Sequence, residues 1–141
     1  MGKSRMAKAF AATMVVALVC GCAIMGKGPS DEELIMQALT GYNAAMVAQD
    51  LDKMMAAYSE DFEGENGESK DDVRDFFSGV IDQGYLEDLE VDMKDCEIKI
   101  EGGKAAVGPV GYSGSFGSVS FEYTMKKDSD GVWRFVETSM Y

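Results

Sequence analysis

Residues 118–126 read SVSFEYTMK, and their pattern decides the fold class. Every second side chain in this stretch is apolar: Val119, Phe121, Tyr123 and Met125. A period of two is typical of a β-strand that buries one face and exposes the other. A glycine–serine turn at 113–117 precedes the stretch, and a DSDG turn at 128–131 follows it. The pattern therefore predicts a strand joined by hairpins to a neighbour on each side.

Neighbouring segments have the same period. Residues 96–101 alternate apolar and charged side chains, and Gly102-Gly103 predicts a turn after them. The next strand is expected over Lys104–Tyr112, where Gly108-Pro109 predicts a bulge or an edge position because proline lacks an N–H donor. A last strand is expected over Val132–Tyr141.

Three helices are expected before these strands. Apolar or small residues recur every three or four positions between Asp31 and Gln49, which is the helical period. Asp50 is the expected N-cap of a short second helix. A third helix is expected over Lys70–Gln83, because Ser69 and Asp72 approximate a capping box.

The third helix is expected to end at Gly84 in the left-handed conformation. Its buried face is expected to consist of Val73, Phe76, Phe77, Val80 and Ile81. Helices followed by a run of antiparallel strands indicate an α+β fold, with three N-terminal helices packed on one face of a curved sheet. Residues 31–141 are the right length for one such domain.

The N-terminus has the features of an export signal. Three basic residues come first, Lys3, Arg5 and Lys8, and an eleven-residue apolar run follows at Ala9–Val19. Such a run is too short to cross a bilayer as a helix but is typical of a signal peptide. Val19-Cys20-Gly21-Cys22 then resembles a bacterial lipobox. We expect residues 1–21 to be a lipoprotein signal peptide and residues 22–30 a lipidated tether that begins at Cys22.

A diacylglyceryl chain on Cys22 would anchor the protein in the cell envelope. The following residue is Ala23 rather than Asp, which favours the outer membrane, facing the periplasm, in a Gram-negative host. Only Cys96 would then remain as a thiol, so no intramolecular disulfide is expected. The alternative is an ordinary secretory signal with incidental cysteines.

Charge and composition exclude several classes of function. Thirteen basic and 25 acidic residues leave a formal charge of −12, and loss of the signal's three basic residues brings it to about −15. Such a chain repels phosphates, so no nucleic-acid partner is expected. The chain contains no histidine, which removes the commonest general base and transition-metal ligand. No metal and no cofactor are expected, because the acidic residues at 60–68 lack the spacing of a calcium loop.

Four segments together resemble the nuclear transport factor 2-like superfamily, which includes SnoaL-like and ketosteroid isomerase-like proteins: 50–62 (DLDKMMAAYSEDF), 67–73 (GESKDDV), 76–77 (FF) and 130–136 (DGVWRFV). The resemblance implies a cone, or cystatin-like roll, in which a strongly curved sheet wraps the helices around a pocket. It also implies frequent homodimers through the sheet. It implies no single activity, because this cone serves enzymes and binding modules alike.

The candidate pocket-lining residues are aromatic: Tyr42, Tyr58, Phe62, Phe76, Tyr112, Phe121, Tyr123 and Trp133. The alternative for each is that it fills the core. Glu137 is the candidate catalytic carboxylate, because strand alternation places it on the same face as Trp133 and Phe135. Facing inward, Glu137 would have a raised pKa and could act as a general base. Facing outward, it would be a solvated surface acid.

Three hypotheses for the function follow. The first is a membrane-anchored, non-catalytic module that binds a small apolar ligand or a partner protein. The second is an enzyme of the SnoaL or ketosteroid isomerase type, in which Glu137 or another carboxylate abstracts a proton and a tyrosine donates to the oxyanion. The third is a structural dimer of the cell envelope without a ligand.

Overall fold

The computed structural model describes residues 28–141, in which the helices come first and the strands follow. The elements are α2 (Asp31–Val47), α3 (Leu51–Ala56), α4 (Lys70–Asp82), β1 (Glu90–Asp92), β2 (Glu97–Glu101), β3 (Lys104–Gly114), β4 (Gly117–Lys127) and β5 (Trp133–Met140). Residues 31–141 form one compact unit. The predicted signal, Cys22 and most of the predicted tether lie outside the described residues.

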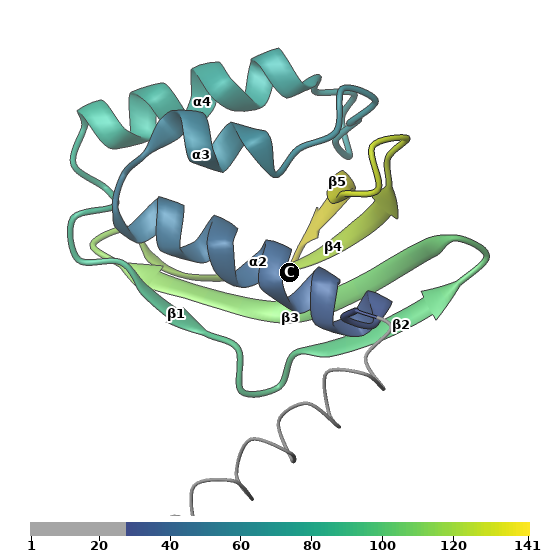
Figure 1. The fold of residues 1–141 in the computed structure, drawn as a ribbon. Coiled ribbons are helices and arrows are strands. Elements are labelled where there is room, and N and C mark those ends of the chain that lie inside the picture. Colours follow the sequence, from purple (N-terminus) through teal and green to yellow (C-terminus); the bar gives the residue numbers. More distant parts are fainter. Residues whose placement is uncertain (1–27) are drawn as a thin grey trace, which may run out of the picture. The chain divides into compact units, whose positions relative to one another are not determined.

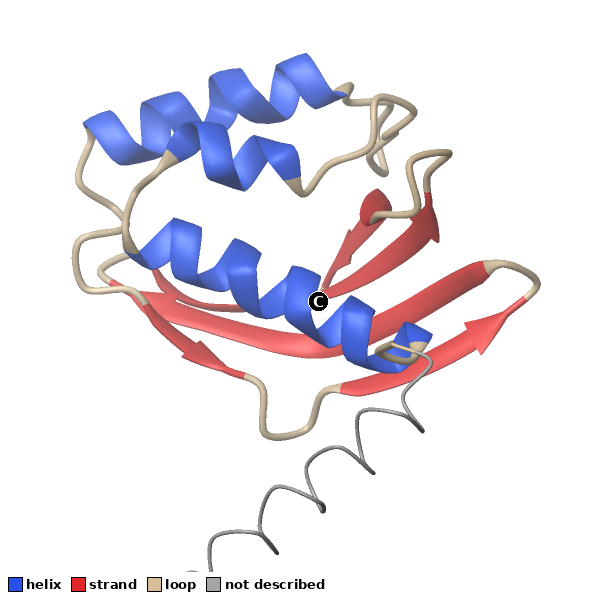
Figure 2. Ribbon diagram, viewed as in Figure 1, coloured by secondary structure: helices blue, strands red, loops and turns tan. Residues whose placement is uncertain are grey.

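All strands pair antiparallel in one sheet, in the order β1-β3-β4-β5. β2 also pairs with β3, because that strand is long enough to hold β2 along its first half and β1 along its second. The sheet curves, and α2 lies along its concave side with α3 and α4 beyond it (Figure 1). Helices and strands are therefore segregated into layers, as Figure 2 shows, and the predicted α+β fold with a strongly curved sheet is confirmed.

The helix ends agree with the predicted local signals. The Asp50 carboxylate accepts a hydrogen bond from the backbone N–H of Lys53 at 3.2 Å, so it caps α3. Ser69 and Asp72 form a reciprocal capping box at the start of α4. Gly84 has a φ of +79°, the left-handed conformation predicted for it.

Two bulges decide which side chains face the helices. In β3 the pairing with β4 shifts between Val107 and Val110, so the predicted bulge at Gly108-Pro109 is confirmed. A Cβ on Gly108 would lie 2.9 Å from the carbonyl oxygen of Phe121, so only glycine fits there. The second bulge is in β5, where Phe135 pairs with Met125 but Glu137 pairs with Thr124. Val136 is the extra residue, and the alternation of faces reverses after it.

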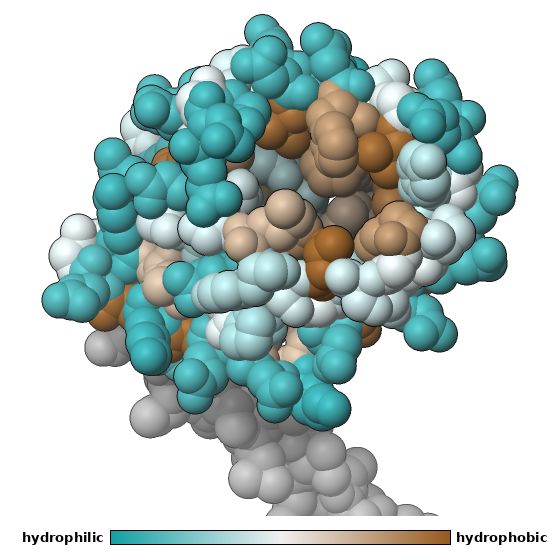
Figure 3. All heavy atoms as spheres, turned by 180° about the vertical axis from the view of Figure 1, so that it is seen from behind, coloured by the Kyte–Doolittle hydropathy of each residue, from teal (hydrophilic) through white to brown (hydrophobic). Residues whose placement is uncertain are grey.

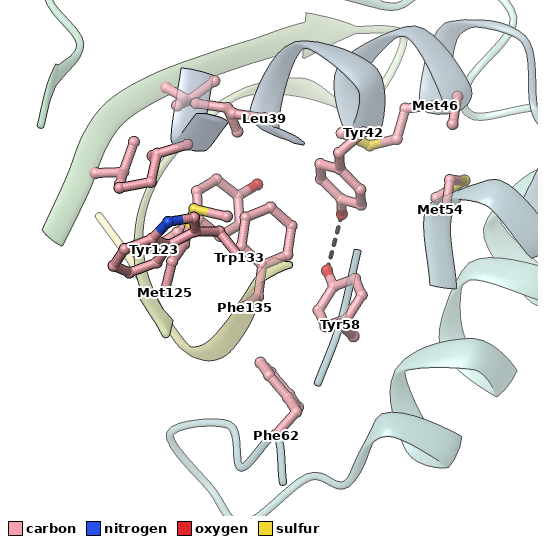
Figure 4. Packing of buried hydrophobic residues seen from close by; sticks show 14 of the residues in the cluster. Leu39, Tyr42, Met46, Met54, Tyr58, Phe62, Tyr123, Met125, Trp133 and Phe135 are labelled. Atoms are coloured by element: carbon pink, nitrogen blue, oxygen red, sulfur yellow. Dashed lines mark hydrogen bonds between the residues drawn. The ribbon is translucent and has the colours of Figure 1, made fainter. Parts of the chain in front are cut away.

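The closed part of the core lies between α2 and the middle of the sheet (Figure 4). Its fully buried apolar side chains are Ile35, Leu39, Met54, Ala105, Val107, Val110, Tyr123, Met125 and Phe135. The Phe135 ring stacks on Tyr123 at 4.4 Å between centroids and meets Tyr42 edge-on at 4.9 Å. These contacts join α2 to β4 and β5.

The predicted buried face of α4 is wrong for Phe76 and only partly met by the other four residues, which pack against the core without being fully buried. No residue of α4 is fully buried, and the Phe76 side chain is 63% exposed. Val73, Phe77, Val80 and Ile81 are only half-buried. The reason is that Val73, Phe77 and Val80 line a cavity, which leaves one side of each uncovered, whereas Ile81 packs against the edge of the core cluster. Among residues 28–141, no helix is long and apolar enough to cross a membrane.

Candidate functional site

A cavity of about 580 Å³ lies between α4, the loop that precedes it, and the sheet. Seen from behind, the surface shows this hollow as apolar side chains surrounded by hydrophilic ones (Figure 3). Ten aromatic side chains contribute to its lining: Tyr42, Tyr58, Phe62, Phe76, Phe77, Tyr85, Tyr112, Phe116, Phe121 and Tyr123. A concave, mostly apolar site of this size, rich in aromatic side chains, is typical of small-molecule binding.

Seven of the eight candidate pocket residues line this cavity, and Trp133 does not. Trp133 is buried where β5 begins, and its indole N–H donates to the Asp31 carboxylate at 3.2 Å. The Lys127 ammonium lies 5.7 Å from the centre of its ring. Trp133 therefore joins the start of α2 to the sheet, as a core residue with a satisfied polar edge.

A short parallel bridge to β5 positions Tyr58 at the cavity. The Phe135 N–H donates to the Ala57 carbonyl at 2.8 Å, and the Ser59 N–H donates to the Phe135 carbonyl at 2.9 Å. Arg134 strengthens this connection, because its guanidinium pairs with Asp128 at 2.9 Å while its Nε donates to the Ala56 carbonyl. The segment after α3 is thereby held against the sheet, and the Tyr58 side chain points towards α2 (Figure 4).

Four of the tyrosines that line the cavity are buried, and their hydroxyls form hydrogen bonds in two pairs. Tyr42 and Tyr58 share a hydrogen bond of 2.8 Å, and Tyr112 and Tyr123 share one of 2.9 Å. The Tyr112 hydroxyl donates to the Asn43 side-chain carbonyl at 2.7 Å. Since a phenol has only one hydrogen, Tyr123 must donate to Tyr112. Tyr58 uses one of the three hydrogen bonds that a hydroxyl can make.

Burial raises the pKa of all four phenols, because the phenolate form loses its hydration in this environment. Hydrogen bonds among the hydroxyls and to Asn43 satisfy these polar groups without a charged partner. At neutral pH the hydroxyls are therefore protonated. They can donate and accept hydrogen bonds, but they cannot act as bases.

Glu137 does not lie at this cavity. The expectation that it shares a face with Trp133 and Phe135 is wrong, because the bulge at Val136 reverses the alternation of faces. Glu137 is exposed and borders a second hollow of about 520 Å³, whose lining includes Lys104 and Lys126. Thr138, the next residue, lines both the main cavity and this second hollow.

Three carboxylates border the main cavity: Glu65, Glu68 and Asp72. The Asp72 carboxylate accepts hydrogen bonds from the N–H and the hydroxyl of Ser69, at 2.8 and 2.9 Å, and these bonds lower its pKa. Backbone hydrogen bonds and the Asn66 side chain likewise lower the pKa of Glu68. Both groups are ionised at neutral pH, which makes them weak bases.

Some lining residues were not singled out from the sequence. Phe116 lies in the glycine–serine turn, Tyr85 follows α4, and Met140 ends β5. The sequence carries no signal for Phe116 or Tyr85, because each is a lone aromatic residue in a connection. Met140 follows from the β5 pattern only when the bulge at Val136 is known.

No protein-family model and no curated protein matches the chain. Solved structures do match it. A cystatin-like protein of unknown function from Nostoc punctiforme is 16% identical with a TM-score of 0.63, over 78% of this chain and 89% of that one. A nuclear transport factor 2-like protein of unknown function from Shewanella oneidensis is 22% identical, at 0.62, over 79% and 98%.

A ketosteroid isomerase-like protein from Erwinia carotovora atroseptica is 19% identical with a TM-score of 0.58, over 79% of this chain and 96% of that one. At these identities the likeness concerns the fold alone. The chain has the cystatin-like cone that nuclear transport factor 2-like proteins share, and this cone defines the class of protein to which its site must be compared.

Proposed function

We propose that this protein is a lipid-anchored module of the cell envelope that binds a small apolar ligand in its cone without transforming it. The observation that carries the proposal is the cavity of about 580 Å³, whose lining is mostly apolar and includes ten aromatic side chains. Four of its lining residues are buried tyrosines whose hydroxyls bond to one another in pairs.

Apolar burial supplies the driving force for such binding. Phe76 and Met140 are 63% and 60% exposed, and both border the cavity. A ligand that covered these side chains would remove apolar surface from water, at roughly 25 cal/mol for each Å². The Tyr58 hydroxyl makes one of the three hydrogen bonds available to it, and we infer that it can form another with a polar atom of the ligand. The site therefore suits a mostly apolar molecule with a single polar group.

The protonation states of the cavity groups favour binding over acid–base catalysis. A general base works best with a pKa near the working pH. The four phenols are held neutral by burial, whereas Glu68 and Asp72 are held ionised by hydrogen bonds. Glu137 faces away, and the chain contains no histidine. Glu68 and Asp72 are therefore weaker proton acceptors than an isomerase-type reaction favours.

The lipid anchor is supported by sequence. A basic start, an eleven-residue apolar run and the Val19–Cys22 lipobox place a modifiable thiol nine residues before α2. Growth with radiolabelled palmitate tests this part. We expect label in the wild-type protein and none in Cys22→Ala. Unlabelled wild-type protein that retains residues 1–21 would contradict the anchor and leave the binding proposal intact.

Binding is tested by calorimetric titration of the full chain, carrying Cys22→Ala, with naphthalenemethanol. Val80→Trp places a large side chain in the cavity, and we expect it to weaken binding at least about tenfold. Val132→Trp is the matched control, because Val132 is exposed and lies outside the lining. Equal affinity in both variants would show that the probe binds elsewhere and would refute the proposed site.

A further inference from the structure

We propose that the cavity selects its ligand by charge, taking an apolar body that carries a cationic group, such as a protonated amine, and disfavouring one that carries an anion. This inference rests on the proposed function and adds the charge class of the ligand. Its origin lies in the rim of the cavity, where charged side chains of one sign meet exposed aromatic rings.

Every charged residue that lines the cavity is acidic. Glu65, Glu68 and Asp72 contribute carboxylates, and no lysine or arginine among residues 28–141 is part of the lining. The two basic residues of α4 are engaged elsewhere. The Lys70 ammonium lies 3.4 Å from the Glu60 carboxylate, and Arg74 pairs with Asp52. The lining that the described residues give this cavity therefore contains no cation, and the lysines that share a hollow with a rim carboxylate are Lys104 and Lys126, which border the second hollow with Glu65.

Hydrogen-bond partners at the rim are neutral donors. Glu68 accepts from the backbone N–H and the side-chain amide of Asn66, at 3.0 and 3.1 Å. Asp72 accepts from Ser69. These bonds fix the orientation of the two carboxylates and favour their ionised form without cancelling the charge. A ligand cation would thus be the first positive partner of either group within the site.

Aromatic rings stand next to these acids. Phe76 follows Asp72 by four residues, so both lie on the same face of α4. The Phe76 ring is largely exposed, and it meets Phe77 edge-on at 5.3 Å between centroids. The face of an aromatic ring carries negative electrostatic potential and attracts a cation. A cationic group at the rim can therefore contact a carboxylate and a ring while its apolar body enters the cavity.

The size of the charge selectivity depends on how far the rim carboxylates are exposed to solvent. Exposed ion pairs contribute little individually, and salt screens them. Three carboxylates act together, however, and they attract a cation while repelling an anion. We therefore expect about a tenfold difference in affinity between a cationic and an anionic ligand with the same apolar body, at low ionic strength.

Three probes with one naphthalene body test the inference: naphthalenemethylamine, naphthalenemethanol and naphthalenecarboxylate. The full chain carrying Cys22→Ala is titrated with each at pH 7. We expect the amine to bind most tightly, the alcohol less tightly and the carboxylate least. The ratio of the affinity for the amine to the affinity for the carboxylate should fall as salt is added.

The source of the selectivity is tested with two pairs of substitutions that change net charge equally. Glu65→Gln with Glu68→Gln removes rim carboxylates, whereas Glu97→Gln with Glu101→Gln removes exposed carboxylates of β2 that lie outside the lining. We expect the ratio to fall to about twofold in the first pair and to persist in the second. A loss of ratio in both pairs would assign the selectivity to net charge and overturn its assignment to the rim.

Two further outcomes separate this inference from the proposed function. Equal binding of the three probes, or tightest binding of the carboxylate, would overturn the charge selectivity while binding in the cavity stands. Failure of all three probes to bind would overturn the proposed function itself, and the inference with it.

Discussion

The two ends of the cone have similar apolar patterns and opposite degrees of burial. At the closed end, α2 packs on the sheet, and Ile35, Leu39, Val107, Met125 and Phe135 are all 0% exposed. At the open end, α4 faces the sheet across the cavity, and Val73, Phe77, Val80, Val119 and Phe121 are all half-buried. The difference arises because α2 packs directly on the sheet at the closed end, whereas a cavity lies between α4 and the sheet at the open end.

Four tyrosines, Tyr42, Tyr58, Tyr112 and Tyr123, separate the two ends. All four belong to the buried core and also line the cavity. The comparison shows that one part of a chain's apolar surface can stabilise the fold while another part remains accessible to a ligand. The substitutions and conditions that follow should affect the two ends differently.

Alkaline pH should have the largest effect on the free energy of unfolding, because it ionises the four tyrosines that separate the two ends. Burial raises the pKa of these four phenols in the folded state, whereas in the unfolded chain they ionise near pH 10. Their contribution to stability is complete below pH 10 and is lost as the pH rises above it. The free energy of unfolding should fall by as much as about 5 kcal/mol per pH unit there.

Urea denaturation between pH 8 and 11, followed with absorbance of phenolate, measures this loss. The buried tyrosines should ionise together with unfolding. Ionisation of all six tyrosines near pH 10 in a protein that stays folded would contradict the buried boundary.

At the closed end, Phe135→Ala should destabilise the fold by about 3–5 kcal/mol. The ring is fully buried and contacts Tyr42, Tyr58 and Tyr123, so its removal leaves a cavity that these rings cannot easily fill. Chemical denaturation measures the change. A loss below about 1 kcal/mol would mean that this end is as loosely covered as the open one.

At the boundary, Tyr112→Phe should cost about 1–3 kcal/mol, because the Asn43 carbonyl loses its donor in a buried position. Tyr141→Phe is the control, since Tyr141 is 71% exposed and its hydroxyl bonds only to the Glu122 carboxylate. The same denaturation assay compares both. Equal stability of the two variants would argue against the Tyr112 network as a structural element.

The smallest effect on stability is expected at the open end. Phe76→Ala should change the free energy of unfolding by less than about 1 kcal/mol, because its ring is mostly in water already. The same variant should weaken the binding of naphthalenemethanol several-fold. Strong destabilisation, or unchanged binding, would remove the distinction between the two ends.

Much of the fold was predictable because its signals are local. The capping box of Ser69 and Asp72 and the left-handed Gly84 act within one helical turn. The bulge at Gly108-Pro109 was predictable, because proline cannot donate in the ladder. The bulge at Val136 was not, since valine is an ordinary strand residue, and the error for Glu137 came from it. β1 was not predicted, because its three residues are too few to show a period.

The sequence by itself determined the order of the helices and of the longer strands, their approximate ends and most of their apolar positions, because periodicity and capping depend on neighbours along the chain. Only the tertiary structure decided which apolar faces meet. It turned Trp133 into the core, moved Glu137 outside, and held α4 apart from the sheet so that a cavity remained. These outcomes depend on contacts between segments far apart in sequence, such as that between Asp31 and Trp133, which no local pattern encodes.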